Sequence, residues 1–473
     1  MGTQISQTLT SVALAVLFIT SFFAIIFKRP KYAIYLYCVV ILLFTGTGLG
    51  AKERIILIYE RGIGVLPLTL INIYLVSVFM FFLFLRVLSR GRGQSTESVK
   101  PIGSLYILLA FSTLYLLFGV VIDIPTREIL SQFGIINIVN MCFFVFVLLW
   151  GVESSEMLDE LKNIALLCLA LSAAYGVFRF FFLGGDPANV YRNIEHLNVR
   201  LTYLDVGQSI LFGFAFDYSV LKLLKDRPSD LKGHAFFAGL ALLSAFNIIF
   251  SYRRNAWAGF VISIIWLIIV LDIKRKLAFA VIGFFCVMFL FTHVAPQRFS
   301  GQSDSLHTRT MTGDFTTGGE ITFRKGRFSE LRNATLVTLK KHPLFGFGPW
   351  GHYVPKALVG NFAFFTHSAI IHVLLKTGLI GLCLFCWPLC SLLFWTTKHR
   401  KLFPKNSKYQ ILSEAAFGGV LFAIPEILFG TPIIIYRHLQ ILGLFIALMC
   451  CSYIFRNSGT ERIDLPSMQK QAA

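Results

Sequence analysis

The chain has 473 residues, of which 56% are hydrophobic and only 14% are charged, and its mean hydropathy is +0.71. Soluble proteins average about 25% charged residues, so this composition excludes a soluble globular protein, a disordered chain and a coiled coil. A net charge of +19 would suggest nucleic acid for a soluble protein, but membrane proteins collect basic residues in their cytoplasmic loops. We therefore expect a polytopic membrane protein with no nucleic-acid partner.

Apolar runs long enough to cross a bilayer recur along the whole chain. A spanning helix needs about 20 such residues. Runs of this kind occur near 9–27, 32–49, 64–86, 101–122, 131–150, 160–183, 203–224, 235–251, 256–273, 277–294, 367–395, 411–430 and 437–455. They predict an all-α, polytopic integral membrane helix bundle of about 12–13 transmembrane helices, which forms a single membrane domain over residues 1–473.

Basic residues divide the connecting loops into two sets. One set holds 23 lysines and arginines and the opposite short loops hold nine, so the first set should be cytoplasmic. This orientation places the C-terminus in the cytoplasm and, with 13 spans, the N-terminus outside. Charged residues within the apolar runs should face the bundle interior, because facing lipid would be costly; these are Arg179, Asp205, Asp217, Lys376, Glu414 and Glu426.

One long hydrophilic segment, 295–365, follows the tenth run and should form a large loop on the outer side. Long loops are often functional, and short helices are expected near 303–312 and 326–341. Within the loop, Gly346, Gly348 and Gly351 match the pattern G-x-G-x-x-G. The match lacks the strand and helix of a dinucleotide-binding unit, so we interpret it as a tight turn that returns the chain to the membrane.

Two adjacent arginines on the outer side stand out. Arg253 and Arg254 occupy a short turn between two spans, where the topology rule predicts few cations. Arginine suits phosphate because its planar fork binds two oxygens together, so the pair suggests a bound anion. Four other outward arginines could converge on the same place: Arg200, Arg324, Arg327 and Arg332.

A histidine marks the point where the long loop enters the next span. His367 lies between Thr366 and Ser368 and is either an interfacial residue or a general base, a common role of histidine near neutral pH. His372 is five residues later, about 140° around a helix, so the two rings should not share a face. We expect no metal site.

Three segments follow one another in a recognisable order. They are Ser251-Tyr-Arg-Arg-Asn-Ala-Trp257, the stretch from Gly326-Arg327 to Gly348, and His367-Ser368 followed by Gly378 and Gly381. They resemble the SRGAW turn, the GR-x3-W…hPl-x-GvG stretch and the H-[NSQ]-x9-G-x-x-G pattern of the O-antigen ligase and O-antigen polymerase superfamily of bacterial envelopes. The likeness covers roughly residues 195–395, and the three segments in order are more specific than any one alone.

The resemblance implies a GT-C-type glycosyltransferase of the bacterial cell inner membrane, surrounded by membrane lipids, with its active face in the periplasm. The donor would be a glycan on undecaprenyl diphosphate and, for a ligase, the acceptor would be lipid A–core. Arg254 and Arg327, helped by Arg253 and Arg200, would hold the diphosphate, and His367 would be the catalytic residue. With arginines neutralising the diphosphate, no metal or other cofactor would be required.

Two alternatives remain open at this point. An O-antigen polymerase would transfer a growing chain onto another lipid-linked repeat unit instead of onto lipid A–core. A lipid-linked glycan transporter would need buried cations along a path open to both sides of the membrane, whereas only Arg179 and Lys376 lie away from the ends of the apolar runs.

Overall fold

The structure is a computed structural model, and it describes most of the chain. The described residues are 22–23, 25–44, 69–88, 100–186, 200–202, 205–226, 230–294, 313–315, 323–325, 327–353, 366–430 and 432–456. The predicted helix near 303–312 lies outside these ranges.

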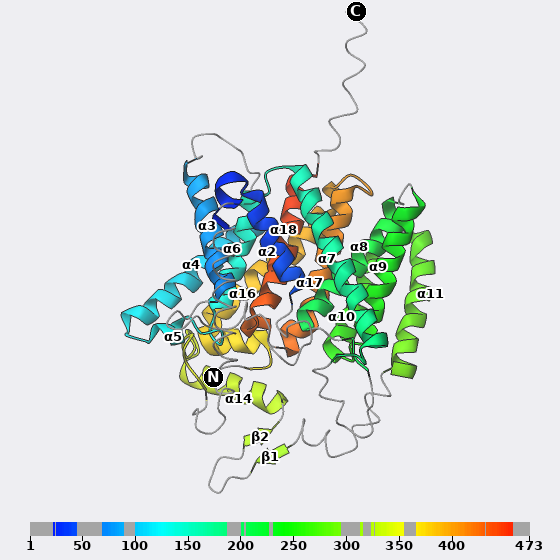
Figure 1. The fold of residues 1–473 in the computed structure, drawn as a ribbon. Helices are drawn as coiled ribbons and strands as arrows, with labels where there is room; N and C mark the ends of the chain where they lie inside the picture. The colour runs from blue at the N-terminus through cyan, green and yellow to red at the C-terminus, as the bar shows by residue number, and fades with distance from the viewer. Residues whose placement is uncertain are drawn as a thin grey trace, which may run out of the picture.

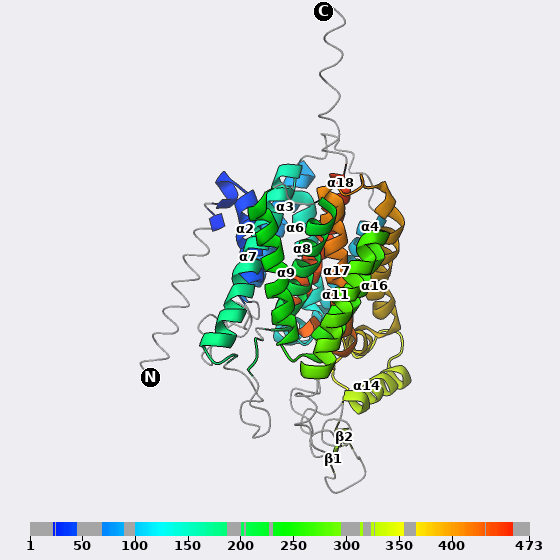
Figure 2. The same cartoon turned by 90° about the vertical axis from the view of Figure 1, so that its right-hand side faces the viewer.

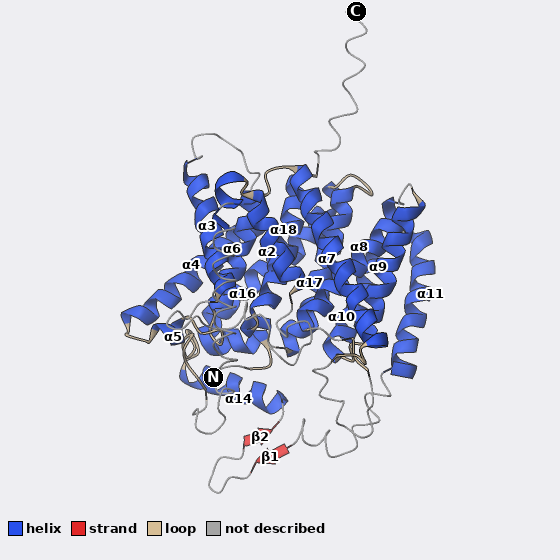
Figure 3. Ribbon diagram, in the orientation of Figure 1, coloured by secondary structure: helices blue, strands red, loops and turns tan. Residues whose placement is uncertain are grey.

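The described residues form a bundle of long helices packed side by side (Figures 1 and 3). Its main members are α2 (Lys31–Leu43), α3 (Leu70–Leu88), α4 (Lys100–Val121), α6 (Ile136–Gly151), α7 (Ser155–Phe182), α8 (Val206–Leu221), α9 (Leu231–Ile249), α10 (Arg254–Val270), α11 (Ile273–Phe289), α16 (Ala369–His399), α17 (Lys408–Phe429) and α18 (Tyr436–Ile454). The predicted all-α membrane bundle is confirmed. Each of these helices matches one predicted apolar run, and the first run, 9–27, lies mostly outside the described residues.

Seven described helices are long and apolar enough to cross a membrane: α3, α4, α7, α9, α16, α17 and α18. Helices α2, α6 and α10 are apolar but shorter. The protein is therefore a multi-pass membrane protein. Helices α17 and α18 are its most enclosed spans, with 83% and 89% of their apolar windows buried, and they form the centre around which the others pack.

Short elements complete the fold at one end of the bundle. Helix α14 (Arg327–Lys341) and the strands β1 (Gly313–Phe315) and β2 (Phe323–Lys325) lie beyond the ends of the spans (Figure 2). The two strands pair antiparallel, with Asp314 opposite Arg324. We call this the loop end of the bundle, and the other the far end. The helix predicted near 326–341 is confirmed by α14, and the long segment 295–365 is the part of the chain that contains these elements.

Among the described residues, cations from the two predicted sets of loops are found at opposite ends of the bundle. At the far end, Lys31 pairs with Glu160 at 3.0 Å and Lys408 pairs with Asp159. At the loop end lie Arg253 and Arg254, at the start of α10. The residues predicted to be buried are confirmed as buried, with exposures of 8% or less for Arg179, Asp205, Asp217, Lys376, Glu414 and Glu426.

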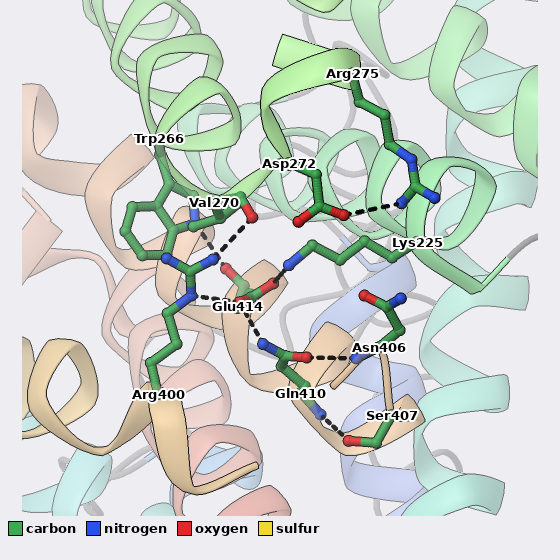
Figure 4. A network of polar contacts seen from close by, with 10 residues as sticks. All are labelled: Lys225, Trp266, Val270, Asp272, Arg275, Arg400, Asn406, Ser407, Gln410 and Glu414. Carbon is green, nitrogen blue, oxygen red and sulfur yellow. Dashed lines mark hydrogen bonds and ion pairs between the residues drawn. The ribbon is translucent and has the colours of Figure 1, made fainter. Parts of the chain in front are cut away.

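Glu414 organises a polar network at the far end (Figure 4). Its carboxylate accepts from Lys225 at 2.5 Å, from Arg400 at 2.6 Å and from Gln410 at 3.1 Å. The backbone oxygen of Glu414 accepts from the indole of Trp266 at 3.0 Å. The network joins α10, α17, the π-helix η3 (Lys222–Asp226) and the 3-10 helix η6 (Arg400–Leu402). Cations that the sequence assigned to cytoplasmic loops therefore also hold the helices together.

Candidate functional site

The turn 251–257 between α9 and α10 is built to present its two arginines. Ser251 accepts the N–H of Arg253 at 3.3 Å, and the Trp257 indole donates to the carbonyl of Ile249, at the end of α9, at 2.9 Å. Tyr252 is buried and has a φ of +52°, a conformation that costs free energy for a residue with a side chain. Burial also raises the pKa of its phenol. The tyrosine and tryptophan face inward, while Arg253 and Arg254 are exposed.

Arg254 is also the first residue of α10. The N-terminus of a helix carries partial positive charge and unpaired N–H groups, so it favours anions. The exposed guanidinium groups and the helix N-terminus therefore point to the same kind of ligand.

Arg200 is close in sequence to a residue that is bonded to the end of α9. Two residues after it, Thr202 donates its N–H to the carbonyl of Phe250 at 3.1 Å and its hydroxyl to that of Asn247 at 2.8 Å. These bonds fix the segment 200–202 against the end of α9, immediately before the arginine turn. Arg200 itself is exposed.

A small pocket lies beside the start of α16, and one of its lining residues contacts the helix that begins at the arginine turn. Asn255 donates to the Glu426 carboxylate at 2.7 Å. Glu426, Ala369 and His438 line the pocket, together with apolar side chains from α8, α16, α17 and α18. Ala369, which lines the pocket, is two residues from His367, and Glu426, which also lines it, contacts Asn255 next to Arg254.

His367 has an acidic partner from the long loop. Its Nδ1 lies 2.8 Å from one carboxylate oxygen of Glu330, and its backbone N–H donates to the other oxygen at 3.0 Å. The side chains are 26% and 18% exposed, so the pair is partly buried but still reachable from outside. Glu330 is on α14 and His367 precedes α16, so the contact joins two motif segments that are 37 residues apart.

Arg327 begins α14, one helical turn before Glu330. Residues at this spacing lie on the same face of a helix. The backbone of Arg327 is therefore placed at the end of α14 that carries the contact to His367. Of the predicted site residues, His367 is thus linked through Glu330 to the helix of Arg327.

The glycine-rich turn closes on a break in α16. Gly378 interrupts the helix with a φ of +65° and a ψ of −163°, a backbone conformation open to glycine alone. Chain returning from α14 fills the break: Leu379 donates to Pro343 at 2.9 Å and Phe347 donates to Leu375 at 2.8 Å. A Cβ on Gly378 would lie 2.2 Å from the Leu344 oxygen. We call this contact between 343–348 and 375–380 the glycine clasp; it confirms the turn predicted from the sequence.

Lys376 also bonds the loop that contains the glycine clasp. Its side chain has no exposed surface and donates to the carbonyl of Gly351 at 2.6 Å. One turn earlier on α16, His372 is buried and lies 3.3 Å from the carbonyl of Gly134. His372 therefore packs inside the bundle while His367 lies in the partly exposed entrance, in agreement with the predicted separation of the two rings.

Three polar residues of this region were not predicted as site residues. Glu330 sits in the position before Leu331 in the second motif, and its carboxylate gave no sequence signal because its partner is 37 residues away. Glu426 was noted only as a costly charge within a span, and His438 only as one of ten histidines. A search for carboxylates one helical turn after a motif arginine would have drawn attention to Glu330.

Comparison with known protein families adds an independent finding. Residues 239–386 match the family model described as O-antigen ligase. The match includes the arginine turn, α14, the glycine clasp and His367. No curated protein matches the chain. The region that carries the candidate site is therefore similar to the O-antigen ligase family.

Proposed function

We propose that this protein transfers a polysaccharide from undecaprenyl diphosphate to a hydroxyl of lipid A–core, as an O-antigen ligase of the GT-C type. The reaction would take place at the periplasmic face of the bacterial inner membrane, with the C-terminus in the cytoplasm. The family match to residues 239–386 supports a ligase-type activity. The observation that carries the finer proposal is the grouping of exposed arginines, a helix N-terminus and His367 around one end of the bundle.

The arginines suit the leaving group of this reaction. When the bond between the first sugar and the diphosphate breaks, negative charge grows on the diphosphate. Cations fixed in advance stabilise such charge without reorganising. We assign this role to Arg254 and Arg327, helped by Arg253 and Arg200, and we expect the arginines to make a divalent metal unnecessary.

His367 suits the other half of the reaction. The acceptor hydroxyl must lose its proton as its oxygen bonds to the sugar carbon released by the diphosphate. His367 would accept that proton, or hold the hydroxyl in line. A positioned general base typically contributes about 10²- to 10⁴-fold to a rate. The lipid tail of the donor would lie against the apolar helices, and the segment 295–365 would form a periplasmic loop over the sugars.

The test is transfer by purified protein supplied with a lipid-linked glycan donor, with metal chelated and each acceptor given in turn. His367→Ala, Arg254→Ala and Arg327→Ala should remain in the membrane and abolish transfer. Arg254→Lys should also impair transfer, because lysine cannot form the two-oxygen contact. Arg127→Ala is the matched control, since Arg127 is an exposed arginine of α5 (Thr126–Ile129) at the same end of the bundle.

Normal transfer by all three alanine variants would refute the assignment. Transfer only to a second lipid-linked repeat, and never to lipid A–core, would identify a polymerase instead. Cells lacking the gene should separate the same two activities. Loss of a ligase leaves full-length polymer on the carrier lipid, whereas loss of a polymerase leaves single repeats attached to the core.

A further inference from the structure

The contact between Glu330 and His367 determines which nitrogen of the neutral imidazole carries the proton. One carboxylate oxygen accepts the backbone N–H of His367 at 3.0 Å and the other lies 2.8 Å from Nδ1. A carboxylate can only accept hydrogen bonds. In the neutral imidazole, the proton therefore sits on Nδ1 and the lone pair sits on Nε2.

We propose that Glu330 is a positioning residue for the transfer reaction: it selects the Nδ1–H tautomer of His367 and directs Nε2 toward the acceptor hydroxyl. This inference rests on the proposed function, in which His367 accepts the acceptor proton. The hydroxyl proton passes to Nε2 as the oxygen bonds to the sugar and the diphosphate leaves. The imidazolium that results is stabilised by the adjacent carboxylate.

The surroundings of the pair are consistent with this role. Glu330 holds both the ring and the backbone of His367, so it fixes the ring orientation as well as the proton. Burial raises the pKa of the Tyr353 phenol, after the glycine clasp, and the Glu330 charge raises it further. The Glu330 carboxylate on α14 contacts the entrance of α16 through His367, and the pair keeps some exposure.

The variant Glu330→Gln distinguishes a role of Glu330 in positioning His367 from a purely structural role. The amide keeps one oxygen for the backbone N–H of His367, so the link between α14 and α16 is preserved. Its other group is an NH₂, which donates and therefore favours a lone pair on Nδ1. The variant keeps the shape but reverses the tautomer, and the proton-accepting atom then faces the wrong way.

We expect Glu330→Gln to lower kcat for transfer by about 10- to 100-fold, a part of what a general base contributes, with KM for the donor within twofold of wild type. Glu330→Asp keeps the charge and should recover part of kcat. In the background of His367→Ala, Glu330→Gln should cause no additional loss, because the two residues act as one unit. Glu128→Gln, an exposed carboxylate of α5, should transfer normally.

The outcomes distinguish the failure of this inference from that of the proposed function. Wild-type kcat in Glu330→Gln, while His367→Ala is inactive, overturns the positioning role alone. An additional loss on the His367→Ala background, or a lower melting temperature in detergent with kcat preserved in the folded fraction, shows a structural tie and also overturns it. Full activity of His367→Ala overturns the base role itself, and the positioning role with it.

Discussion

The glycine clasp makes a sharp prediction about Gly378. At this residue α16 is broken, with a φ of +65° and a ψ of −163°. A side chain there costs about 1–3 kcal/mol in backbone strain. A Cβ would also lie 2.2 Å from the Leu344 oxygen and 2.5 Å from the Phe345 nitrogen. These are backbone atoms that cannot turn aside, and overpacking of this kind typically costs a further 1–3 kcal/mol, roughly. Gly378→Ala should therefore destabilise the clasp by about 2–6 kcal/mol.

The assay is thermal unfolding of the protein in detergent, monitored by size-exclusion chromatography. Transfer is measured in parallel. Gly239→Ala is the control: Gly239 lies in α9, and a Cβ there would meet nothing within 4 Å. Alanine in a helix is favoured over glycine by about 0.5–1 kcal/mol, so this variant should match or exceed the wild type. Because the clasp lies between α14 and α16, Gly378→Ala should also reduce transfer. Equal melting temperatures for the two variants would refute the reasoning.

Three other predictions concern buried cations and topology. Arg437→Met leaves Asp205, its partner at 2.6 Å, buried without a cation, which should cost about 3–5 kcal/mol and lower the melting temperature in detergent; an unchanged value would count against the pair. Glu414→Gln removes the carboxylate shared by Lys225 and Arg400 and should destabilise the far end by a similar amount, while a double-mutant cycle of Glu414→Gln with Lys225→Met should show coupling of at least about 1 kcal/mol. A membrane-impermeant maleimide should label Glu128→Cys in the periplasm of intact cells and Lys401→Cys only after the membrane is opened; the reverse pattern would place His367 in the cytoplasm and contradict the proposed function.

The sequence predicted the architecture well because the bilayer imposes a simple rule. Apolar runs of about 20 residues form helices, and twelve predicted runs appear as described helices. The predicted burial of charges such as Asp217 and Glu414 follows from the same rule, since an ionised group facing lipid is costly. The rule does not say which helices touch, so the packing of α17 and α18 at the centre came only from the structure.

Some residues of the candidate site were singled out from the sequence because of their local context. Arg253, Arg254 and His367 were found because each breaks a local expectation about charge or boundary position. Glu330 breaks none: a glutamate in the first turn of a helix is common, since it favours the positive end of the helix dipole. Its significance comes from a partner in another element, and such long-range pairs are not determined by spacing along the chain. The break at Gly378 was likewise hidden in an apolar run, where the structure shows the loop completing the helix.

The cations of the described residues fall into groups that differ in what they contact. Many cations lie at the far end, where the topology rule expects them, and several of these also hold helices together through Glu160, Asp159 and Glu414. The buried cations have partners within the protein, such as Asp186 for Arg179 and Asp205 for Arg437. The charges of Arg179 and Arg437 are compensated by these carboxylates, so both are poor candidates for a ligand site.

The exposed arginines of the loop end form a different population. Arg200, Arg253 and Arg254 lie around one turn and beside one helix N-terminus, although the topology rule predicts few cations in these short loops. A transporter would instead need uncompensated cations along a path through the bundle, and the buried cations Arg179 and Arg437 are paired with carboxylates. Exposed positive charge at the end of the bundle that also carries His367 and its acidic partner supports the proposed transferase over a transporter.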